Sequence, residues 1–389
     1  MKPLPRFGMV YMTFVAIACL VAFMAQSIPN FAELPLADYH HYMTAYDYFA
    51  GNLDSFEVRF PYNQRIFIPW LAAQLPIANP IHSFLLINLI ITLVGAYFWL
   101  KIWQFLNFSQ IKIIGITFFF LLHFAGWLRL HIFDPVTTDP AQMAIYAVGL
   151  YILLKRHYYY LIPFSILSLL IKESTIALLM AFLICGFLMR ESKRNIVLIA
   201  IVTIIAFLGL LIINSHFAGL GTPSKGFLYS IYNNLSLLLS QPDLILRWLA
   251  ALLVVFGGFP ALVFSSRNNW NWDQADKILV ITGLSILGLS LIGGQDYTRL
   301  IMFSAPLLLT FVIKNAGKEN WKWILTLIGS LPLMYLLGRI PDPVEKREEF
   351  EALFPEYGVI EGIWPYLIYG VVVNLILVVI FHFLGRQSR

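Results

Sequence analysis

The segment ADYHHYMTAYDYF, residues 37–49, places an acidic residue at the head of an aromatic and amphipathic stretch. It follows the first hydrophobic run of the chain, residues 9–28, so Asp38 is expected just beyond a membrane face. A carboxylate held there can accept the proton of a hydroxyl group while the lipid phase delivers a second reactant. The alternative is that Asp38 only caps the helix that it begins.

A second polar position lies between two short apolar runs, where Lys172 is followed by Glu173. Charged side chains at membrane depth are costly and usually face a cavity or a partner. One interpretation is that Lys172 faces an anion such as a phosphate group. The other is a local ion pair between Lys172 and Glu173 at a turn.

Arg65 and Arg299 are two further cations that could hold an anion. Arg65 lies in the Pro-bounded apolar segment 59–76, and Arg299 ends the tetrapeptide DYTR, which begins with Asp296. The guanidinium group offers a planar fork of donors that matches phosphate. The alternative for Arg299 is a simple salt bridge with Asp296 at a helix end.

Four other polar residues are weaker candidates. Asp139 precedes Pro140, which is typical of a helix start. His41 is a candidate for hydrogen bonding to a bound ligand, or else a residue of a solvated loop. His131, Asp134 and Asp139 could together gather a divalent cation, but nothing in their spacing demands one. No metal site and no cofactor is therefore predicted.

The composition indicates whether this chain folds in water or in a membrane. Of its 389 residues, 59% are hydrophobic and 12% are charged, and the mean hydropathy is +0.77. Soluble domains carry about 25% charged residues. We therefore expect a polytopic membrane protein, in which the excess of Lys and Arg encodes orientation rather than affinity for nucleic acid. Cys19 and Cys185 both lie in apolar runs and suggest neither a metal nor a redox pair.

The hydrophobic runs predict an all-α, polytopic membrane protein with about 12 transmembrane helices. A rival interpretation fuses residues 160–189 into one long helix and reverses everything downstream. The runs lie at about 9–28, 81–105, 112–130, 140–154, 160–171, 174–189, 196–214, 244–264, 278–292, 300–313, 323–338 and 364–384.

Charge predicts the orientation. With both termini in the cytoplasm, the basic loops RESKR (190–194) and KNAGKENWK (314–322) lie inside, as the positive-inside rule requires. We expect a single transmembrane domain over residues 1–389, with outer loops at 29–80, 215–243 and 339–363. The first of these loops is expected to hold interfacial helices, with an apolar face formed by Tyr39, Tyr42, Met43, Tyr46 and Phe49.

The order of the short motifs resembles the GT-C superfamily, integral-membrane glycosyltransferases that use polyprenyl-phosphate-linked sugars. The resemblance covers about residues 9–310 and depends on order and spacing, because each motif alone is weak. The motifs are D-x-x-x-Y (38–42), R-I-F-I-P-W (65–70), T-D-P (138–140), the dipeptide K-E (172–173) and D-Y-T-R (296–299).

The resemblance implies a role for each candidate. Asp38 is the catalytic base, and the cations that neutralise the donor phosphate are Lys172, Arg65 and Arg299. The residues for acceptor binding or a second carboxylate are Asp139, Glu173, Asp296 and His41.

The expected reaction is an inverting transfer from a polyprenyl-phosphate sugar to a hydroxyl group of a glycan, lipid or protein, on the outer face of a bacterial inner membrane. No nucleic-acid partner is expected, because the basic residues encode orientation. No nucleotide site is expected either, since the chain contains no P-loop and no dinucleotide fingerprint. The alternatives are a secondary transporter, which would bury ionisable groups near the membrane midplane, and a ligase or polymerase for whole lipid-linked oligosaccharides.

Overall fold

The structure is a computed structural model of the chain. It describes residues 5–26, 28, 38–218, 226–267, 270, 272–294, 296–316, 320–334, 340–354 and 360–387. Over these residues the chain is helical and forms no β-strand, which confirms the all-α class. Its contacts group the chain into two compact units: unit 1 comprises Met1–Phe105 and Trp127–Tyr232, and unit 2 comprises Leu106–Gly126 and Asn233–Arg389.

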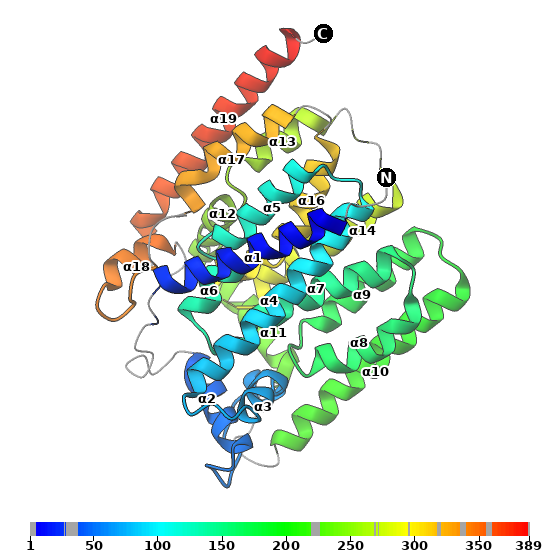
Figure 1. Ribbon diagram of the computed structural model, residues 1–389, viewed down its shortest axis with the longest axis vertical. Coiled ribbons are helices and arrows are strands. Elements are labelled where there is room, and N and C mark those ends of the chain that lie inside the picture. Colours follow the sequence, from blue (N-terminus) through cyan, green and yellow to red (C-terminus); the bar gives the residue numbers. More distant parts are fainter. Residues whose placement is uncertain are drawn as a thin grey trace. The chain divides into compact units, whose positions relative to one another are not determined.

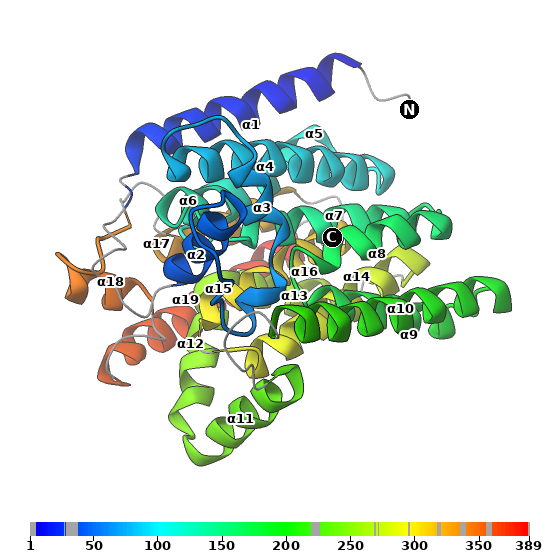
Figure 2. The same cartoon turned by 90° about the horizontal axis from the view of Figure 1, so that it is seen from below.

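Unit 1 is organised around α4 (Pro80–Phe105), which packs along α7 (Asp139–Leu154) and against α1 (Pro5–Ala25) (Figure 2). The helices α4 and α7 approach closely because Gly95 has no side chain: a Cβ atom there would lie 3.2 Å from the Cα atom of Ala144. The other helices that lie wholly in this unit are α2 (Asp38–Phe49), α3 (Phe67–Ala73), α6 (Trp127–Phe133), α8 (Leu161–Leu169), α9 (Thr175–Leu188), α10 (Lys193–Ala218) and the short 3₁₀ helices η2 (Tyr62–Gln64) and η3 (Tyr158–Tyr160).

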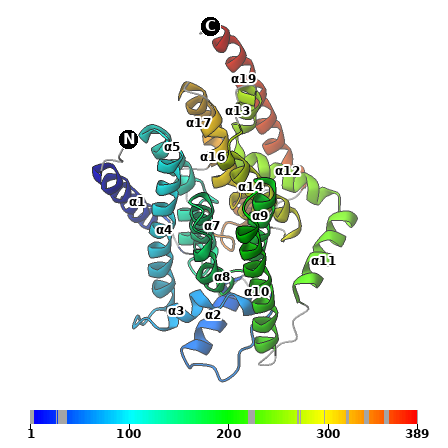
Figure 3. The ribbon, with the colours of Figure 1, turned by 90° about the vertical axis from the view of Figure 1, so that its right-hand side faces the viewer.

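The segment expected to be the first outer loop contains α2, η2 and α3, which lie together at one end of α4 (Figure 3). On α2, Tyr42 is 1% exposed and Tyr46 is 8% exposed. The rings of these two residues therefore pack inside the protein rather than forming a free apolar face. Tyr39, Met43 and Phe49 are half-buried.

Six helices are long and apolar enough to cross a membrane among the residues described, so the expected count of about 12 is not confirmed. Other apolar runs form shorter helices, such as α7, α9 and α16 (Ala305–Asn315). The run at 160–189 is broken between α8 and α9 rather than forming one helix. The six candidate spans are Phe7–Met24, Pro80–Phe105, Gln110–Arg129, Lys193–Phe217, Gln274–Ile292 and Trp364–Leu384.

Unit 2 contains α12 (Asp243–Phe256) and α13 (Phe259–Ser266), which meet at a corner formed by the helix break at Gly257 and Gly258, and α11 (Gly226–Ser240) crosses the boundary between the units. The C-terminal helix α19 (Trp364–Gln387) packs against α13 and α17 (Asn320–Met334) (Figure 1). The other elements of unit 2 are α5 (Gln110–Leu122), α14 (Gln274–Ile292), α15 (Tyr297–Met302), α16, α18 (Arg347–Leu353) and the 3₁₀ helix η5 (Ile360–Ile363). In the expected outer loop 339–363, α18 has no buried residue.

The corner between α12 and α13 depends on a glycine and on α19. Gly257 has φ +52°, and a Cβ atom there would lie 2.3 Å from Oγ of Ser330. The amide of Asn374 on α19 donates to the carbonyl oxygen of Gly257 at 2.9 Å and accepts from the backbone N–H of Ala261 at 2.8 Å. The side chain of Asn374 thus replaces hydrogen bonds that the helix loses at the break.

The start of α14 is tied to the end of α16. Asp273 and Asp276 form a capping box at the first turn of α14. The ammonium group of Lys314, in the last turn of α16, lies 2.6 Å from Oδ2 of Asp273 and 2.9 Å from Oδ1 of Asp276. The two helix ends are therefore held together at one point of unit 2.

Candidate active site

Arg65 is the centre of a buried polar cluster in unit 1. Its guanidinium group donates to Glu173 twice, from Nε to Oε2 at 2.9 Å and from Nη2 to Oε1 at 2.5 Å. A third hydrogen bond runs from Nη1 to the hydroxyl of Tyr42 at 3.1 Å. Arg65 is 8% exposed, and such burial is tolerated because the carboxylate partner offsets the lost hydration. The contact joins the segment before α3 to the turn between α8 and α9.

Tyr62 connects Arg65 to Asp38. Its hydroxyl donates a hydrogen bond to Oδ1 of Asp38, and its ring centroid lies 5.3 Å from the guanidinium carbon of Arg65. The ring also stacks on the imidazole of His41, with centroids 4.5 Å apart. Burial, followed by the negative charge of Asp38, raises the pKa of Tyr62 far above its usual range. The hydroxyl therefore stays protonated and remains a donor.

The hydroxyl of Tyr42 experiences the charges on several sides of the cluster. It is hydrogen-bonded to Oγ1 of Thr138 at 3.1 Å, immediately before α7. Burial raises the pKa of Tyr42 to about 12; Arg65 opposes this shift, and the negative charges of Asp38 and Asp139 add to it. Three predicted site residues thus act on one phenol group.

Lys172 pairs with Asp139 rather than with its neighbour in the chain. The Nζ atom of Lys172 lies 2.7 Å from Oδ1 of Asp139, and both side chains are 6% exposed. The local pair between Lys172 and Glu173 is therefore not the one that forms, because Glu173 binds Arg65. The alternative for Asp139 also holds in part, since Asp139 is the first residue of α7 and is followed by Pro140.

Two sets of hydrogen bonds position the elements that carry these groups. The side-chain amide of Asn88 on α4 donates to the carbonyl oxygens of Pro135 at 2.7 Å and Thr137 at 3.2 Å, which fixes the turn before α7. The backbone N–H of Phe67 donates to the carbonyl oxygen of Leu170 at 3.0 Å. This bond ties the start of α3 to the end of α8.

Arg299 and Asp296 form their own pair in unit 2. The guanidinium Nη2 of Arg299 donates to Oδ2 of Asp296 at the start of α15. The two side chains are 20% and 30% exposed. This is the helix-end salt bridge that the sequence offered as the alternative to phosphate binding.

The structure gathers most of the predicted site residues in one unit. Sequence reasoning missed Tyr62 and Thr138 as parts of the cluster, and it assigned Tyr42 to an apolar face. The available signals were weak: Tyr62 lies three residues before Arg65, and Tyr42 lies one helical turn after Asp38. The predicted residues that lie in unit 1 are Asp38, His41, Arg65, Asp139, Lys172 and Glu173.

Over the side chains that the structure describes, no group of three His, Cys, Asp or Glu residues could hold a metal ion. The side chain of His131, which belonged to the weakly indicated cation site, lies outside the described part of the chain.

No family model, no curated protein and no solved structure matches this chain. What the cluster does must therefore be inferred from its own residues.

Proposed function

We propose that this chain is an inverting glycosyltransferase of the GT-C type, which moves a sugar from a polyprenyl-phosphate carrier to an acceptor hydroxyl group. The observation that supports this function best is the cluster of unit 1. There, the half-buried carboxylate of Asp38 shares its surroundings with two buried cations, Arg65 and Lys172. A base beside anion-binding groups is what transfer from a sugar phosphate requires.

Each group has one task in the proposed reaction. Asp38 accepts the proton of the acceptor hydroxyl as the hydroxyl oxygen attacks the anomeric carbon. The bond from that carbon to the phosphate oxygen breaks, its electron pair leaves with the polyprenyl phosphate, and the configuration inverts. Arg65 and Lys172 stabilise the leaving anion. The phosphate-binding role that the sequence suggests for Arg299 is a separate proposal, because Arg299 lies in unit 2.

The carboxylate partners keep the cations in position before the donor arrives. Arg65 is bound to Glu173 and Lys172 to Asp139. A phosphate group offers more acceptor oxygens than a carboxylate and competes for the same donors. Once displaced, Glu173 and Asp139 become acceptors for sugar hydroxyl groups, which is the role proposed for them together with His41.

The finer topology is part of the same proposal. We infer about 12 crossings, both termini in the cytoplasm and the cluster facing outward from an inner membrane. Short apolar helices such as α7, α8 and α9 can cross where neighbouring helices shield their ends or where they line a cavity. The basic loop RESKR between α9 and α10 supports a cytoplasmic position there.

The test is sugar transfer in proteoliposomes that contain a polyprenyl-phosphate sugar. Asp38→Asn removes the base and should lower turnover by about 10²–10⁴-fold while the protein stays folded. Asp54→Asn removes an exposed carboxylate of the same segment and should leave turnover unchanged. Tyr62→Phe keeps the ring but loses the bond to Asp38, so an intermediate loss is expected. Full activity of Asp38→Asn excludes the assigned role.

A secondary transporter is the second candidate, and one observation favours it. The pair of Lys172 and Asp139 is buried where α8 and α9 are interrupted, and ionisable groups beside broken helices are typical of transport sites. Uptake of a labelled sugar phosphate into protein-containing vesicles, without formation of a glycosylated product, would favour this function over transfer.

A further inference from the structure

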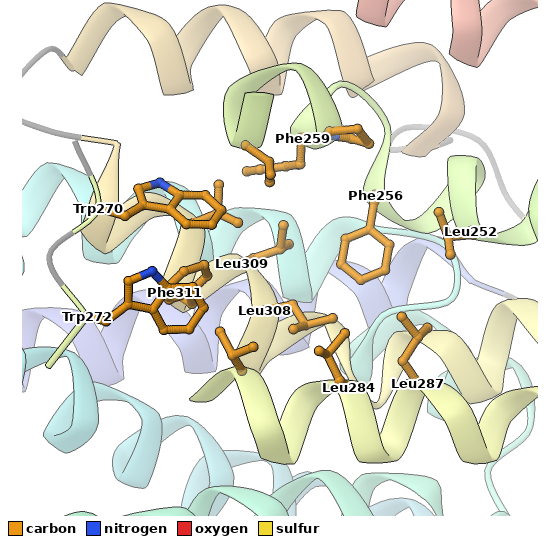
Figure 4. Close-up of a pocket in the computed structure, with 14 residues that line it drawn as sticks. Leu252, Phe256, Phe259, Trp270, Trp272, Leu284, Leu287, Leu308, Leu309 and Phe311 are labelled. Atoms are coloured by element: carbon orange, nitrogen blue, oxygen red, sulfur yellow. The ribbon is translucent and has the colours of Figure 1, made fainter. Parts of the chain in front are cut away.

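Unit 2 contains an apolar pocket that is separate from the cluster of unit 1. Its volume is about 360 Å³, within the range of about 300–1,000 Å³ that small-ligand sites occupy. Its walls come from α12, α13, α14, α16 and the segment between α13 and α14, with side chains pointing into it from all of these (Figure 4). Every lining residue is aliphatic or aromatic.

The pocket has a buried floor and an exposed mouth. On the floor, Phe259 is 2% exposed, Leu309 is 1% exposed and Phe311 is 4% exposed. At the mouth, Leu284 of α14 is 53% exposed and Trp272 is 46% exposed. The helix α14 is one of the candidate membrane spans, so we expect the exposed side of Leu284 to face lipid.

An empty apolar pocket in this position is unfavourable. A void leaves the atoms around it without partners for dispersion contacts. A water molecule would find few polar groups among the lining side chains, which offer only the indole N–H groups of Trp270 and Trp272, and the N–H of Trp270 already donates to Oγ of Ser266 at 3.1 Å. A lipid chain from the surrounding bilayer would restore the dispersion contacts and needs no polar partner.

The end of the pocket marked by the two tryptophans is aromatic and basic. The rings of Trp270 and Trp272 lie against Phe311, with centroids 4.8 Å and 5.1 Å away. Tryptophan is enriched at the depth of the lipid head groups. Arg267 directly follows α13, and Lys277 lies in the first turn of α14; both are exposed.

We propose that the pocket holds one acyl chain of an anionic phospholipid, whose head group is bound by Arg267 and Lys277. Lys314 is engaged by Asp273 and Asp276, so it braces the helix ends while the two exposed cations contact the phosphate. Attraction between anionic lipid and basic residues at the membrane surface supplies the preference for a negative head group. The site does not depend on the glycosyltransferase proposal.

Native mass spectrometry of the full chain in detergent tests this assignment, with phosphatidylglycerol, phosphatidylcholine and undecaprenyl phosphate as probes. One phosphatidylglycerol should be retained most strongly. Leu284→Trp fills the mouth and should weaken retention at least about tenfold. Leu249→Trp makes the same change at an exposed leucine of α12 outside the pocket and should have no effect. Arg267→Gln with Lys277→Gln should abolish the preference over phosphatidylcholine.

Two results would overturn the assignment: unchanged retention of phosphatidylglycerol by Leu284→Trp, or equal retention of phosphatidylglycerol and phosphatidylcholine by the unmodified protein. Should Leu284→Trp fail to fold, the unmodified protein is photo-labelled with phosphatidylglycerol that carries a diazirine on its acyl chain. Labelled peptides from α14 and α16 support the site. Labels confined to other helices refute it.

Discussion

Lys172 donates a hydrogen bond to Asp139 across 2.7 Å, although the residue beside Lys172 in the chain is Glu173. Glu173 binds Arg65 instead. Two adjacent residues of one turn therefore reach in two directions, to the start of α7 and to the segment before α3. The turn between α8 and α9 therefore connects the start of α7 with the segment before α3, and it is also part of the candidate site.

Removing either partner of the buried pair between Lys172 and Asp139 should lower the stability of the protein. We expect Lys172→Met or Asp139→Asn alone to lower the free energy of unfolding by about 3–5 kcal/mol, because each leaves an uncompensated buried charge. The double variant should lose much less than the sum. The measurement is unfolding in mixed detergent micelles with increasing dodecyl sulfate.

An exposed pair provides the control for that cycle. Lys346 and Glu349 lie 3.1 Å apart, with side chains 55% and 60% exposed. Lys346→Met should change the free energy of unfolding by no more than about 1 kcal/mol. Strictly additive losses in the buried pair would contradict its assignment as one coupled unit.

Arg65→Lys should not preserve the cluster, although it preserves the charge. Lysine cannot reproduce the two parallel hydrogen bonds to Glu173 together with the third to Tyr42. We expect a loss of about 1.5–3 kcal/mol for a missing charged hydrogen bond, and a parallel loss of transfer activity. Arg347→Lys, at an exposed residue, is the matched control and should behave as the unmodified protein. Wild-type stability of Arg65→Lys would show that the fork geometry is unimportant.

The protein should lose stability in mildly acidic solution through His41. Burial, reinforced by Arg59, lowers the pKa of His41 from 6.5 to about 4, against the opposite influence of Asp38. Between these two values the unfolded chain binds more protons than the folded one, so stability falls as the pH falls through this window. Because His41 is only half-buried, solvent reduces the effect.

His41→Phe keeps an aromatic ring against Tyr62 but cannot titrate. Its free energy of unfolding should change less than that of the unmodified protein between about pH 7 and pH 4.5. An identical pH dependence in His41→Phe would assign the acid sensitivity to another group.

A single methyl group at Gly257 should weaken unit 2. The φ of +52° and the short approach to Ser330 both oppose a side chain there, and a strained residue of this kind costs about 1–3 kcal/mol. Gly288 lies within α14 with no atom within 4 Å of an added Cβ atom, so Gly288→Ala should be neutral or stabilise by up to about 1 kcal/mol. Thermal unfolding of both variants checks the contrast.

The helices could be predicted largely from apolar runs. The run at 81–105 corresponds to α4, and the run at 364–384 lies within α19. A prediction from apolar runs is wrong where the helix breaks at residues that are themselves apolar. Gly257 and Gly258 keep the run at 244–264 apolar while the backbone bends there, so two helices were expected to be one.

The site was less accessible to sequence reasoning. Asp38, Arg65 and Lys172 attract attention because a charge in an apolar chain is rare. Their partners depend on the placement of elements far apart in the chain, as the sequence separation of 108 positions from Arg65 to Glu173 illustrates. Tyr62 lies in a segment without periodic pattern, so nothing in the sequence distinguishes it from other loop tyrosines.

The hydrogen bonds of Asn374 to the α12–α13 corner can form only late in biosynthesis, because α19 is the last helix to be made. Until α19 has been synthesised, the carbonyl oxygen of Gly257 lacks the amide donor of Asn374, and the N–H of Ala261 has only its hydrogen bond of 3.1 Å to the carbonyl oxygen of Gly258. Exposed main-chain groups are penalised by several kcal/mol in hydrocarbon, so the nascent bend stays vulnerable to misfolding and quality control. Chains cut short before residue 374 should therefore be degraded, even though every element preceding that point has been made.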